Sequence, residues 1–330
     1  MTADIQFHHE RATETTSAKH PTLDMLRRWV STTNMRASVI VNIRSSRTRK
    51  HLADLPGLIT ARGIEIDSFT IVPHERALRK RLKRVVKDGA TLAIVGGGDG
   101  AMTTACDVLA HETCALGLVP LGTGNSFALT LGIPDHVPGA LDVIAGGRIV
   151  NVDLGTVNGT HFANFATIGL SAEIADRAPH ALKAIVGRLA YAIGGIRSFF
   201  THKAFRAKIR WDTGKKRIDT QQIVIANGRF FGSQPVTPDA TITDRRLALF
   251  TTTGVSHLEV ARMYVAFGLG LQTKLPDAIV LSSREIVVKT SPRQLVSIDG
   301  NTLGKTPARF GVAPRALRVC VPVNFDDARH

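Results

Sequence analysis

The segment Thr91-Leu-Ala-Ile-Val95-Gly-Gly-Gly-Asp-Gly100-Ala101 carries the clearest indication of both the fold and the candidate site. Its first half is short, apolar and rich in strand-forming residues, which predicts a buried strand, and residues 101–111 continue as a helix. Glycine lets the backbone approach a ligand closely, and the start of a helix offers unpaired N–H groups to an anion. Four glycines in five residues exceed what a tight turn requires. The pattern therefore predicts a phosphate site between a strand and a helix.

Asp99 stands inside this glycine loop. A carboxylate among phosphate-binding amides repels phosphate unless it holds a metal ion or accepts a proton during a reaction. The combination favours phosphoryl transfer over passive phosphate binding.

A second glycine-containing loop, Pro120-Leu-Gly-Thr-Gly-Asn-Ser126, follows the next apolar run along the chain, residues 116–120. Loops at the carboxyl ends of strands in one open sheet line a single crevice, where α/β proteins bind their ligands. We therefore expect the two loops to form one site.

Around these loops, strands and helices alternate. Strands are predicted at 38–42, 65–72, 91–95 and 116–120, and helices at 49–62, 76–87 and 101–111. This alternation implies right-handed crossovers and a parallel sheet covered on both faces. We expect a nucleotide-binding α/β domain over residues 37–150, preceded by an N-terminal extension over 1–36.

After residue 150 the pattern changes to consecutive strands, which predicts an antiparallel sandwich or barrel. Of the two we expect a β sandwich over residues 151–330, with the extreme C-terminus packing back on the first domain. Two helices interrupt the strands, at 172–200 and 257–271. The predicted strands are 151–157, 161–168, 204–211, 217–225, 246–252, 285–289 and 294–298.

Composition excludes several classes of protein. The 330 residues are 44% hydrophobic, enough for a sizeable core, and carry a net charge of +15. No uninterrupted apolar stretch approaches the roughly 18 residues of a membrane span, and no signal peptide is recognisable. Three scattered cysteines do not form a disulfide framework, so we expect a reducing, cytoplasmic environment.

The positive charge is concentrated in the predicted helix at 76–87, which carries seven Lys and Arg residues opposite an apolar stripe. Such a helix is either a solvated surface or a face for anionic lipid headgroups at the inner membrane surface. Aromatic residues make up only 5% of the chain and no stacking pattern accompanies the charge, so no nucleic-acid partner is expected.

Other motifs are weak. Gly96-x-Gly98-x-x-Ala101 fits a dinucleotide fingerprint, but no acidic residue follows the next strand. Gly300-x-x-x-Gly304-Lys-Thr is one residue short of a Walker loop, and Gly124-Asn-Ser126-Phe-Ala128 lacks the second glycine of a nucleophile elbow.

The two loops resemble those of the diacylglycerol kinase catalytic family, which includes bacterial lipid kinases, sphingosine kinases and ceramide kinases. The resemblance covers residues 39 to about 323. Its motifs are Val-Gly-Gly-Gly-Asp-Gly (95–100), Pro-Leu-Gly-Thr-Gly-Asn (120–125), Val-Asp-Leu-Gly (152–155), Gly-Arg-Leu-Ala-Tyr (187–191), Ala-Asn-Gly-Arg-Phe-Phe-Gly (226–232), Thr-Pro-Asp-Ala (237–240) and Ile-Asp-Gly (298–300).

This resemblance implies ATP in the N-terminal crevice, Mg²⁺ as cofactor, and a diacylglycerol-like or sphingoid lipid held by the β-rich domain as phosphoryl acceptor. Catalytic candidates are Asp99, Asp299 and Asp153, with Asp99 favoured as base. Candidates for contacts to the lipid substrate or phosphate are Lys183 and Arg188. Nucleotide-binding candidates are Asn42, Arg47, Gly96, Gly97, Gly98, Gly100, Gly122, Thr123, Gly124 and Asn125.

The chain departs from the family pattern in several places. Asn301 stands where the family has a glutamate that is often assigned as the base, and an amide cannot accept a proton at neutral pH. Ser126 stands where the family usually has an aspartate, which sphingosine-kinase-like members also lack. Asp244 matches an aspartate that holds a structural magnesium in some bacterial members, but the glycine that usually follows is Arg245.

Two alternatives remain open. One is a diverged member of the fold that binds lipid or nucleotide without turnover, motivated by Asn301, Ser126 and Thr104. The other is an NAD kinase, whose family shares the Gly-Gly-Asp-Gly loop. The acceptor lipid and the oligomeric state do not follow from the sequence.

Overall fold

The structure, a computed structural model, describes residues 35–44, 46–177, 201–228, 230–231, 234–235 and 241–326. Residues 35–330 form one unit by their contacts and residues 1–34 another. The predicted N-terminal extension therefore falls outside the described residues, except for its last two.

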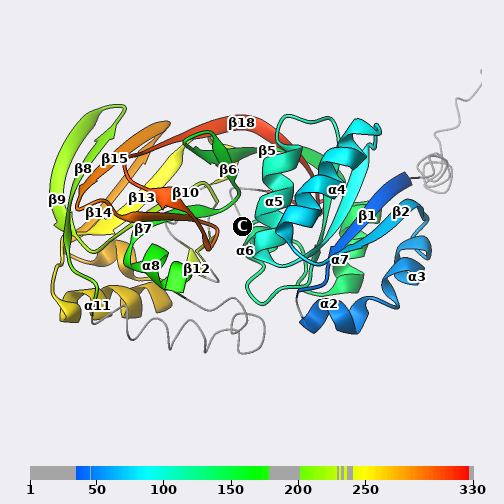
Figure 1. Cartoon of the computed structure of the whole chain (residues 1–330), viewed down its shortest axis with the longest axis horizontal. Coiled ribbons are helices and arrows are strands. Elements are labelled where there is room, and N and C mark those ends of the chain that lie inside the picture. Colours follow the sequence, from blue (N-terminus) through cyan, green and yellow to red (C-terminus); the bar gives the residue numbers. More distant parts are fainter. Residues whose placement is uncertain are drawn as a thin grey trace, which may run out of the picture. The chain divides into compact units, whose positions relative to one another are not determined.

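The N-terminal α/β domain is built on a parallel sheet, as predicted (Figure 1). Its strand order is β2-β1-β3-β4, and all neighbouring pairs run parallel. The strands are β1 (Met35–Asn42), β2 (Ile64–Val72), β3 (Leu92–Gly97) and β4 (Ala115–Pro120). All six residues of β3 and all six of β4 are buried, in agreement with their apolar sequences.

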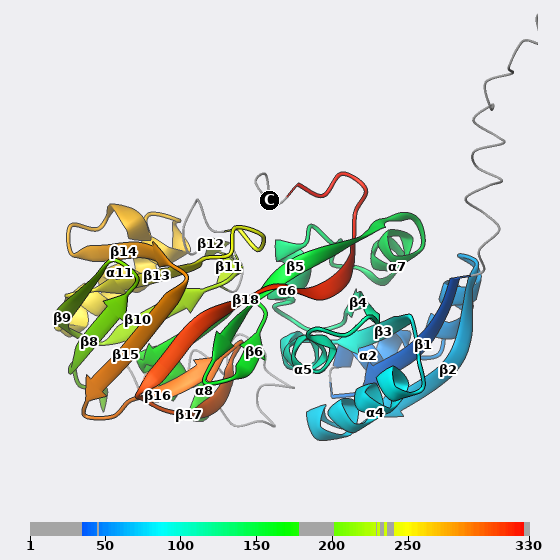
Figure 2. The same cartoon turned by 90° about the horizontal axis from the view of Figure 1, so that it is seen from above.

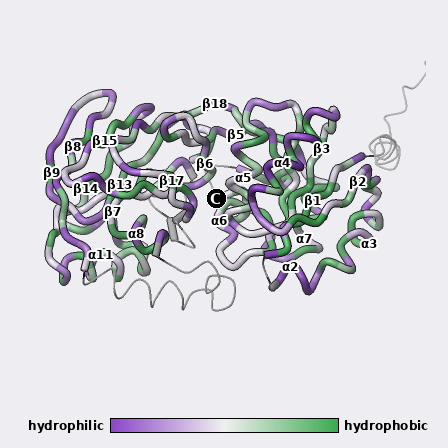
Figure 3. Tube along the Cα trace, in the orientation of Figure 1, coloured by the Kyte–Doolittle hydropathy of each residue, from purple (hydrophilic) through white to green (hydrophobic). Residues whose placement is uncertain are grey.

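Helices cover both faces of this sheet. They are α2 (Ser46–His51), α3 (Leu55–Thr60), α4 (Glu75–Lys87), α5 (Asp99–Leu109), α6 (Ser126–Thr130) and α7 (Val137–Gly146). Because successive side chains of a strand point to opposite faces, Ile40 packs with α4 and α5, whereas Val39 and Val41 pack with α3 and α7. In Figure 3 the strands of this domain carry many hydrophobic residues, whereas hydrophilic residues are frequent along α4.

One long strand carries the same sheet into the C-terminal domain. The strand β18 (Ala308–Val321) pairs parallel with β4 and antiparallel with β5 (Arg148–Val157) and β15 (Glu285–Ser291). Figure 2 shows β18 and β5 running between the N-terminal α/β domain and the C-terminal domain. The sheet continues through β8 (Phe205–Trp211) to β9 (Gly214–Thr220), and β6 (Thr160–Phe162) pairs with β5.

A second, antiparallel sheet packs against the first and completes the predicted β sandwich. Its order is β14-β13-β10-β7-β16-β17. The strands are β7 (Phe165–Gly169), β10 (Gln222–Ala226), β13 (Leu247–Thr252), β14 (Ala278–Ser283), β16 (Leu295–Ile298) and β17 (Asn301–Lys305). The remaining elements are α8 (Leu170–Arg177), α11 (His257–Gly268), a 3-10 turn (Gln272–Lys274) and the short pair β11 (Phe230–Phe231) and β12 (Gln234–Pro235).

Three predicted elements are divided in two. The helix predicted at 49–62 is α2 and α3, because Pro56 lies in the first turn of α3, where a proline starts a helix more readily than it continues one. The strand predicted at 217–225 is β9 and β10, which belong to different sheets. The strand predicted at 161–168 is β6 and β7, and the amides between them bind a carboxylate described below.

Other elements were not predicted. Helix α7 occupies the segment expected to be the domain boundary. The strands β14, β17 and β18 are also absent from the predicted set. The three cysteines are buried and unpaired. Within the described ranges, no helix has both the length and the apolar character needed to cross a membrane.

Candidate functional site

The two glycine loops touch through their backbones. A Cβ atom added at Gly122 would lie 2.5 Å from the Cα atom of Gly98, and one added at Gly98 would lie 3.1 Å from the Cα atom of Gly122. The Leu121 amide also donates to the Gly97 carbonyl (2.8 Å). Neither position has room for a side chain, so the glycines at 98 and 122 permit this contact between loops.

Asp99 links the loops by its side chain. It is the first residue of α5, and its carboxylate accepts hydrogen bonds from the amides of Asn125 (3.0 Å) and Ser126 (2.7 Å). A Cβ atom at Gly124 would lie 2.7 Å from Asp99 Oδ2, so the carboxylate also requires glycine there. Burial raises the pKa of Asp99, and the hydrogen bonds from Ser126 and Asn125 oppose that rise. The carboxylate thus fixes the second loop against the start of α5.

The junction between the two glycine loops also contains backbone amides that the contacts described above do not use. None of the hydrogen bonds above uses the amides of Gly98, Gly100, Thr123 or Gly124. Gly98 is the N-cap of α5, and the first amides of a helix together with its dipole form a favourable environment for an anion. The arrangement suits the binding of phosphate groups.

Asn125 and Arg47 stabilise the second loop. Asn125 adopts a left-handed conformation (φ 48°), and its side chain both accepts from the Gly122 amide (2.9 Å) and donates to the Gly122 carbonyl (3.0 Å). Arg47 also donates to that carbonyl (2.8 Å), and both side chains contact Asp135. The buried side chain of Asn42, at the end of β1, accepts from the Arg44 amide (3.2 Å).

Asp299 connects the two domains. It follows β16, is 7% exposed, and accepts hydrogen bonds from the amides between β6 and β7 and at the start of β7: Ala163 (2.9 Å), Asn164 (3.1 Å) and Phe165 (3.0 Å). The Thr103 hydroxyl of α5 donates to the same carboxylate (3.0 Å). Burial raises the pKa of Asp299 to about 6, although these hydrogen bonds favour its charged form.

Asp153 is a second buried carboxylate that connects distant parts of the chain by hydrogen bonds. It lies in β5, is 3% exposed, and accepts from the amides of Arg245 (2.8 Å) and Arg315 (2.7 Å). Both arginines have positive φ angles, 60° and 52°, which L-residues adopt rarely. The carboxylate stabilises two strained turns from distant parts of the chain.

Of the predicted site residues, the structure brings together those of the two loops, Asn42 and Arg47, and it joins Asp299 to α5 through Thr103. Lys183 and Arg188 lie outside the described residues. Asp244 is exposed, and its carboxylate accepts from the Arg246 amide (2.8 Å). In the parts of the chain that the structure describes, no group of three or more His, Cys, Asp or Glu side chains is arranged to hold a metal ion.

Several residues of the site were not predicted. Thr103 and Asp135 were not proposed as members, and Glu75, which starts α4, reaches the first turn of α5. No local pattern identifies them, because each is defined by contacts with residues far away in the sequence.

The chain matches two families in succession. Residues 36–157 match the diacylglycerol kinase catalytic domain, and residues 164–321 match the YegS C-terminal NAD kinase beta sandwich-like domain. The chain is 26% identical over 291 residues to a diacylglycerol kinase of Staphylococcus haemolyticus, covering 87% of this chain and 88% of that protein. It is 27% identical over 292 residues to a diacylglycerol kinase of Staphylococcus aureus, covering 87% and 92%.

A solved structure has the same fold. The crystal structure of a diacylglycerol kinase from Bacillus anthracis superposes with a TM-score of 0.67 at 20% identity, covering 89% of this chain and 98% of that one. The two matched families follow one another from residue 36 to residue 321, and the relatives align over both domains. The chain therefore belongs to the diacylglycerol kinase catalytic-domain family.

Proposed function

We propose that the protein is a lipid kinase that transfers the γ-phosphoryl group of ATP to a hydroxyl group of a diacylglycerol-like or sphingoid lipid. The named relatives support the lipid kinase class. The observation that carries the proposal is the backbone contact between the two glycine loops, held by the Asp99 carboxylate at the start of α5.

In this proposal the nucleotide phosphates lie on the amides of the two loops. Phosphoryl transfer depends mainly on alignment and electrostatic stabilisation, so a rigid set of N–H donors is a suitable device. Arg47 is 45% exposed and donates to the Gly122 carbonyl, so it places a positive charge beside the second loop. Lys183 and Arg188, outside the described residues, are further candidates for neutralising the moving phosphoryl group.

The residues present also fit Mg²⁺. In nucleotide sites this ion keeps several waters and needs only one or two carboxylates besides the phosphates. Each Asp99 oxygen accepts one amide and retains acceptor capacity, and the residue is partly exposed. Asp99 would hold the ion, which would supply positive charge to the phosphates.

The β domain is the proposed holder of the lipid. Asp299 and Asp153 act in this proposal by positioning: they fix the turns that join this domain to α5 and β18.

A membrane-derived acceptor must also reach the site, and α4 offers a surface for that purpose. Its apolar stripe is buried, whereas Arg76, Lys80, Lys83 and Lys87 lie on one exposed stripe.

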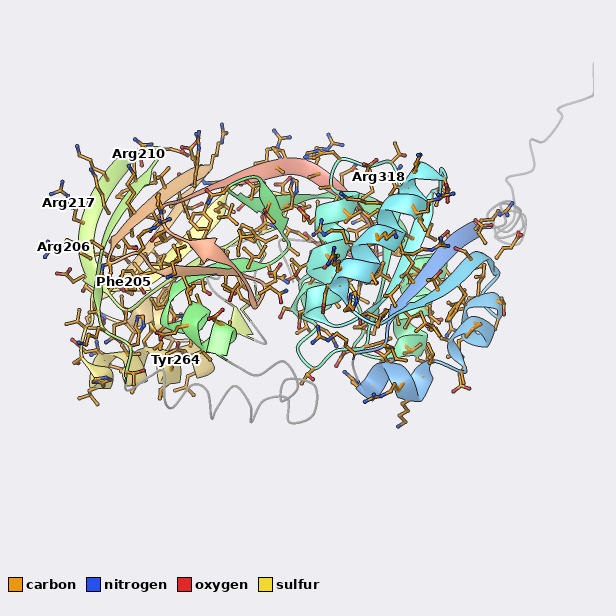
Figure 4. The ribbon with its side chains drawn as sticks, in the orientation of Figure 1. Phe205, Arg206, Arg210, Arg217, Tyr264 and Arg318 are labelled. Carbon is orange, nitrogen blue, oxygen red and sulfur yellow. The ribbon has the colours of Figure 1, made fainter. Side chains whose placement is uncertain are left out.

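We therefore propose that α4 binds the anionic headgroups of the membrane surface. Among the described residues, the α4 cations that form ion pairs lie off this stripe: Arg79 pairs with Asp107 and Arg84 with Asp88. A second basic surface lies on the outer face of β8 and β9, from which Arg206, Arg210 and Arg217 project (Figure 4). That surface provides a control of similar charge.

The experiment is transfer of labelled γ-phosphate from ATP to a panel of lipids, read by mass spectrometry. The acceptors are diacylglycerol, sphingoid base, ceramide and glycerophospholipid in vesicles with and without anionic lipid, and NAD is included. We expect a phosphorylated lipid, faster transfer on anionic vesicles, and loss of that acceleration in K80E/K83E/K87E but not in R206E/K208E/R210E.

Other outcomes would decide between the alternatives. ATP binding without product from any acceptor would favour the diverged, non-catalytic member of the family. Phosphorylation of NAD would replace the lipid kinase proposal by an NAD kinase. Equal loss of anionic acceleration in both triple variants would remove the specific role of α4.

A further inference from the structure

The carboxylates near the glycine loops differ in what their oxygens already bind. Both oxygens of Asp99 accept backbone amides, and Asp299 accepts three amides and a hydroxyl. Asp153 likewise uses both oxygens and is 3% exposed. A group that takes a proton from a substrate hydroxyl must lie within hydrogen-bond reach of it, with an oxygen open to the substrate. Asp299 and Asp153 are too deeply buried to meet that requirement, and the two Asp99 oxygens, which would hold the metal ion, are each already turned toward a backbone amide.

Glu75 meets it better. Its side chain is 37% exposed, and its Oε2 atom accepts a hydrogen bond from Arg44 Nη1 at 3.0 Å. Its other oxygen, Oε1, lies 3.3 Å from the position that a Cβ atom at Gly100 would occupy. Arg44 therefore holds one oxygen of the carboxylate, and the other faces the first turn of α5 beside the glycine loop.

Asn301 approaches the same point from the other domain. Its Nδ2 atom lies 3.6 Å from the same Cβ position at Gly100, so the start of α4, the start of α5 and the start of β17 converge there. A Cβ atom at Gly100 would thus be in tight contact with Glu75 and in ordinary van der Waals contact with Asn301. An amide can orient a hydroxyl by hydrogen bonding but cannot take its proton at neutral pH.

Glu75 lies in the first turn of α4, where a helix favours an acidic side chain, but its carboxylate does not cap that helix. The N-cap of α4 is His74, whose Nδ1 atom accepts from the Ala77 amide (3.1 Å). The Glu75 carboxylate instead contacts a residue after β1 and lies against a neighbouring helix.

We propose that Glu75 accepts the proton of the acceptor hydroxyl during phosphoryl transfer, an inference that rests on the proposed kinase function. The hydroxyl oxygen forms a bond to the γ-phosphorus of ATP, and the bond from that phosphorus to the β–γ bridging oxygen breaks. ADP leaves with the electron pair of the broken bond. The hydroxyl proton passes to Glu75 Oε1 and is later released to water. Asn301 orients the hydroxyl.

The experiment moves the carboxylate between the two positions that reach Gly100. Turnover of the lipid acceptor identified for the wild type is measured in E75Q, in N301E and in the double variant E75Q/N301E. Thermal unfolding and binding of a fluorescent ATP analogue are measured alongside. The matched control is E65Q: Glu65 also pairs with an arginine, Arg36, but lies at the start of β2, the opposite end of the parallel strands from the loops.

For E75Q we expect kcat to fall by about 10²- to 10⁴-fold, the range for loss of general-base catalysis, with KM for ATP and nucleotide binding little changed. The double variant should recover at least tenfold of that loss, because residue 301 reaches the same point. The control E65Q should match the wild type.

Three results would overturn the inference. A wild-type kcat in E75Q, or a loss that is fully explained by a raised KM for ATP, would remove the proton-accepting role. Absence of any recovery in a folded E75Q/N301E protein would contradict the shared position. A wild-type protein that phosphorylates no acceptor would instead overturn the proposed function itself, and this inference with it.

Discussion

Two aspartates follow strands of different domains and make the same kind of contact with different consequences. Asp99 follows β3, and Asp299 follows β16. Each accepts backbone amides from a segment distant in the sequence. Asp99 joins two loops of one domain, whereas Asp299 joins the β domain to helix α5 of the other through Thr103.

The two carboxylates are therefore suited to different roles. Asp99 remains partly exposed at a junction with glycine amides, so its contacts organise a surface that a ligand can reach. Asp299 is buried, with four hydrogen bonds from protein groups, so its contacts organise the protein. A motif containing aspartate does not by itself distinguish these two uses.

The largest expected effect is on stability, in Asp299→Ala. Removing the carboxylate leaves three amides and a hydroxyl without their acceptor, and each unsatisfied buried donor costs about 1–3 kcal/mol. We expect the free energy of unfolding to fall by roughly 3–5 kcal/mol, measured by urea denaturation. The control is Asp244→Ala, at an exposed position, with a loss below about 1 kcal/mol. Equal losses in the two variants would contradict the bracing role of Asp299.

The next effect separates the two aspartates by activity. In Asp99→Asn one side-chain oxygen remains, and the new NH₂ group faces a backbone amide, so the second loop is displaced from α5. We expect kcat/KM for ATP-dependent transfer to fall by about 10²-fold or more, because displacements of about 1 Å at such a site have effects of that size. The free energy of unfolding should fall by only about 1 kcal/mol.

Asp299→Asn provides the reverse case. It should lose more stability than Asp99→Asn and retain more transfer activity for each folded molecule. Near-normal turnover in Asp99→Asn would show that the contact between loops is not needed for the reaction.

Much of the fold could be predicted because it depends on local sequence. The apolar runs of β1, β3 and β4, and the glycines after β3 and β4, carry their own pattern, so the parallel sheet and the two loops at its edge were identified correctly. The β sandwich was likewise confirmed as a class.

The remainder depends on contacts between distant residues. The break between β6 and β7 falls where the amides of Ala163 and Asn164 turn toward Asp299, which is 136 residues away from Ala163. Glu75 and Asn301 converge on Gly100 from separate elements. No local sequence pattern predicts either of these long-range contacts. The roles of Asp299 and Glu75 could therefore be recognised only in the three-dimensional structure.

The smallest predicted effect concerns the pH dependence of stability. Burial raises the pKa of Asp299 to about 6 in the folded protein, compared with about 3.9 for an unfolded aspartate. Between these values the folded protein binds a proton that the unfolded chain does not, so the contribution of Asp299 to stability increases as the pH falls through 6. We expect this contribution to be about 1 kcal/mol larger at pH 5 than at pH 7.5.

The measurement is the difference in unfolding free energy between the wild type and Asp299→Asn across this pH range, because the asparagine does not titrate and the other carboxylates cancel. Two influences compete at Asp299: burial favours the neutral carboxyl group, whereas three amides and the Thr103 hydroxyl favour the carboxylate. If burial dominates, the stability advantage of the wild type grows toward pH 5. If instead that advantage grows toward pH 7.5, the hydrogen bonds dominate, and Asp299 stabilises the folded protein as a charged carboxylate.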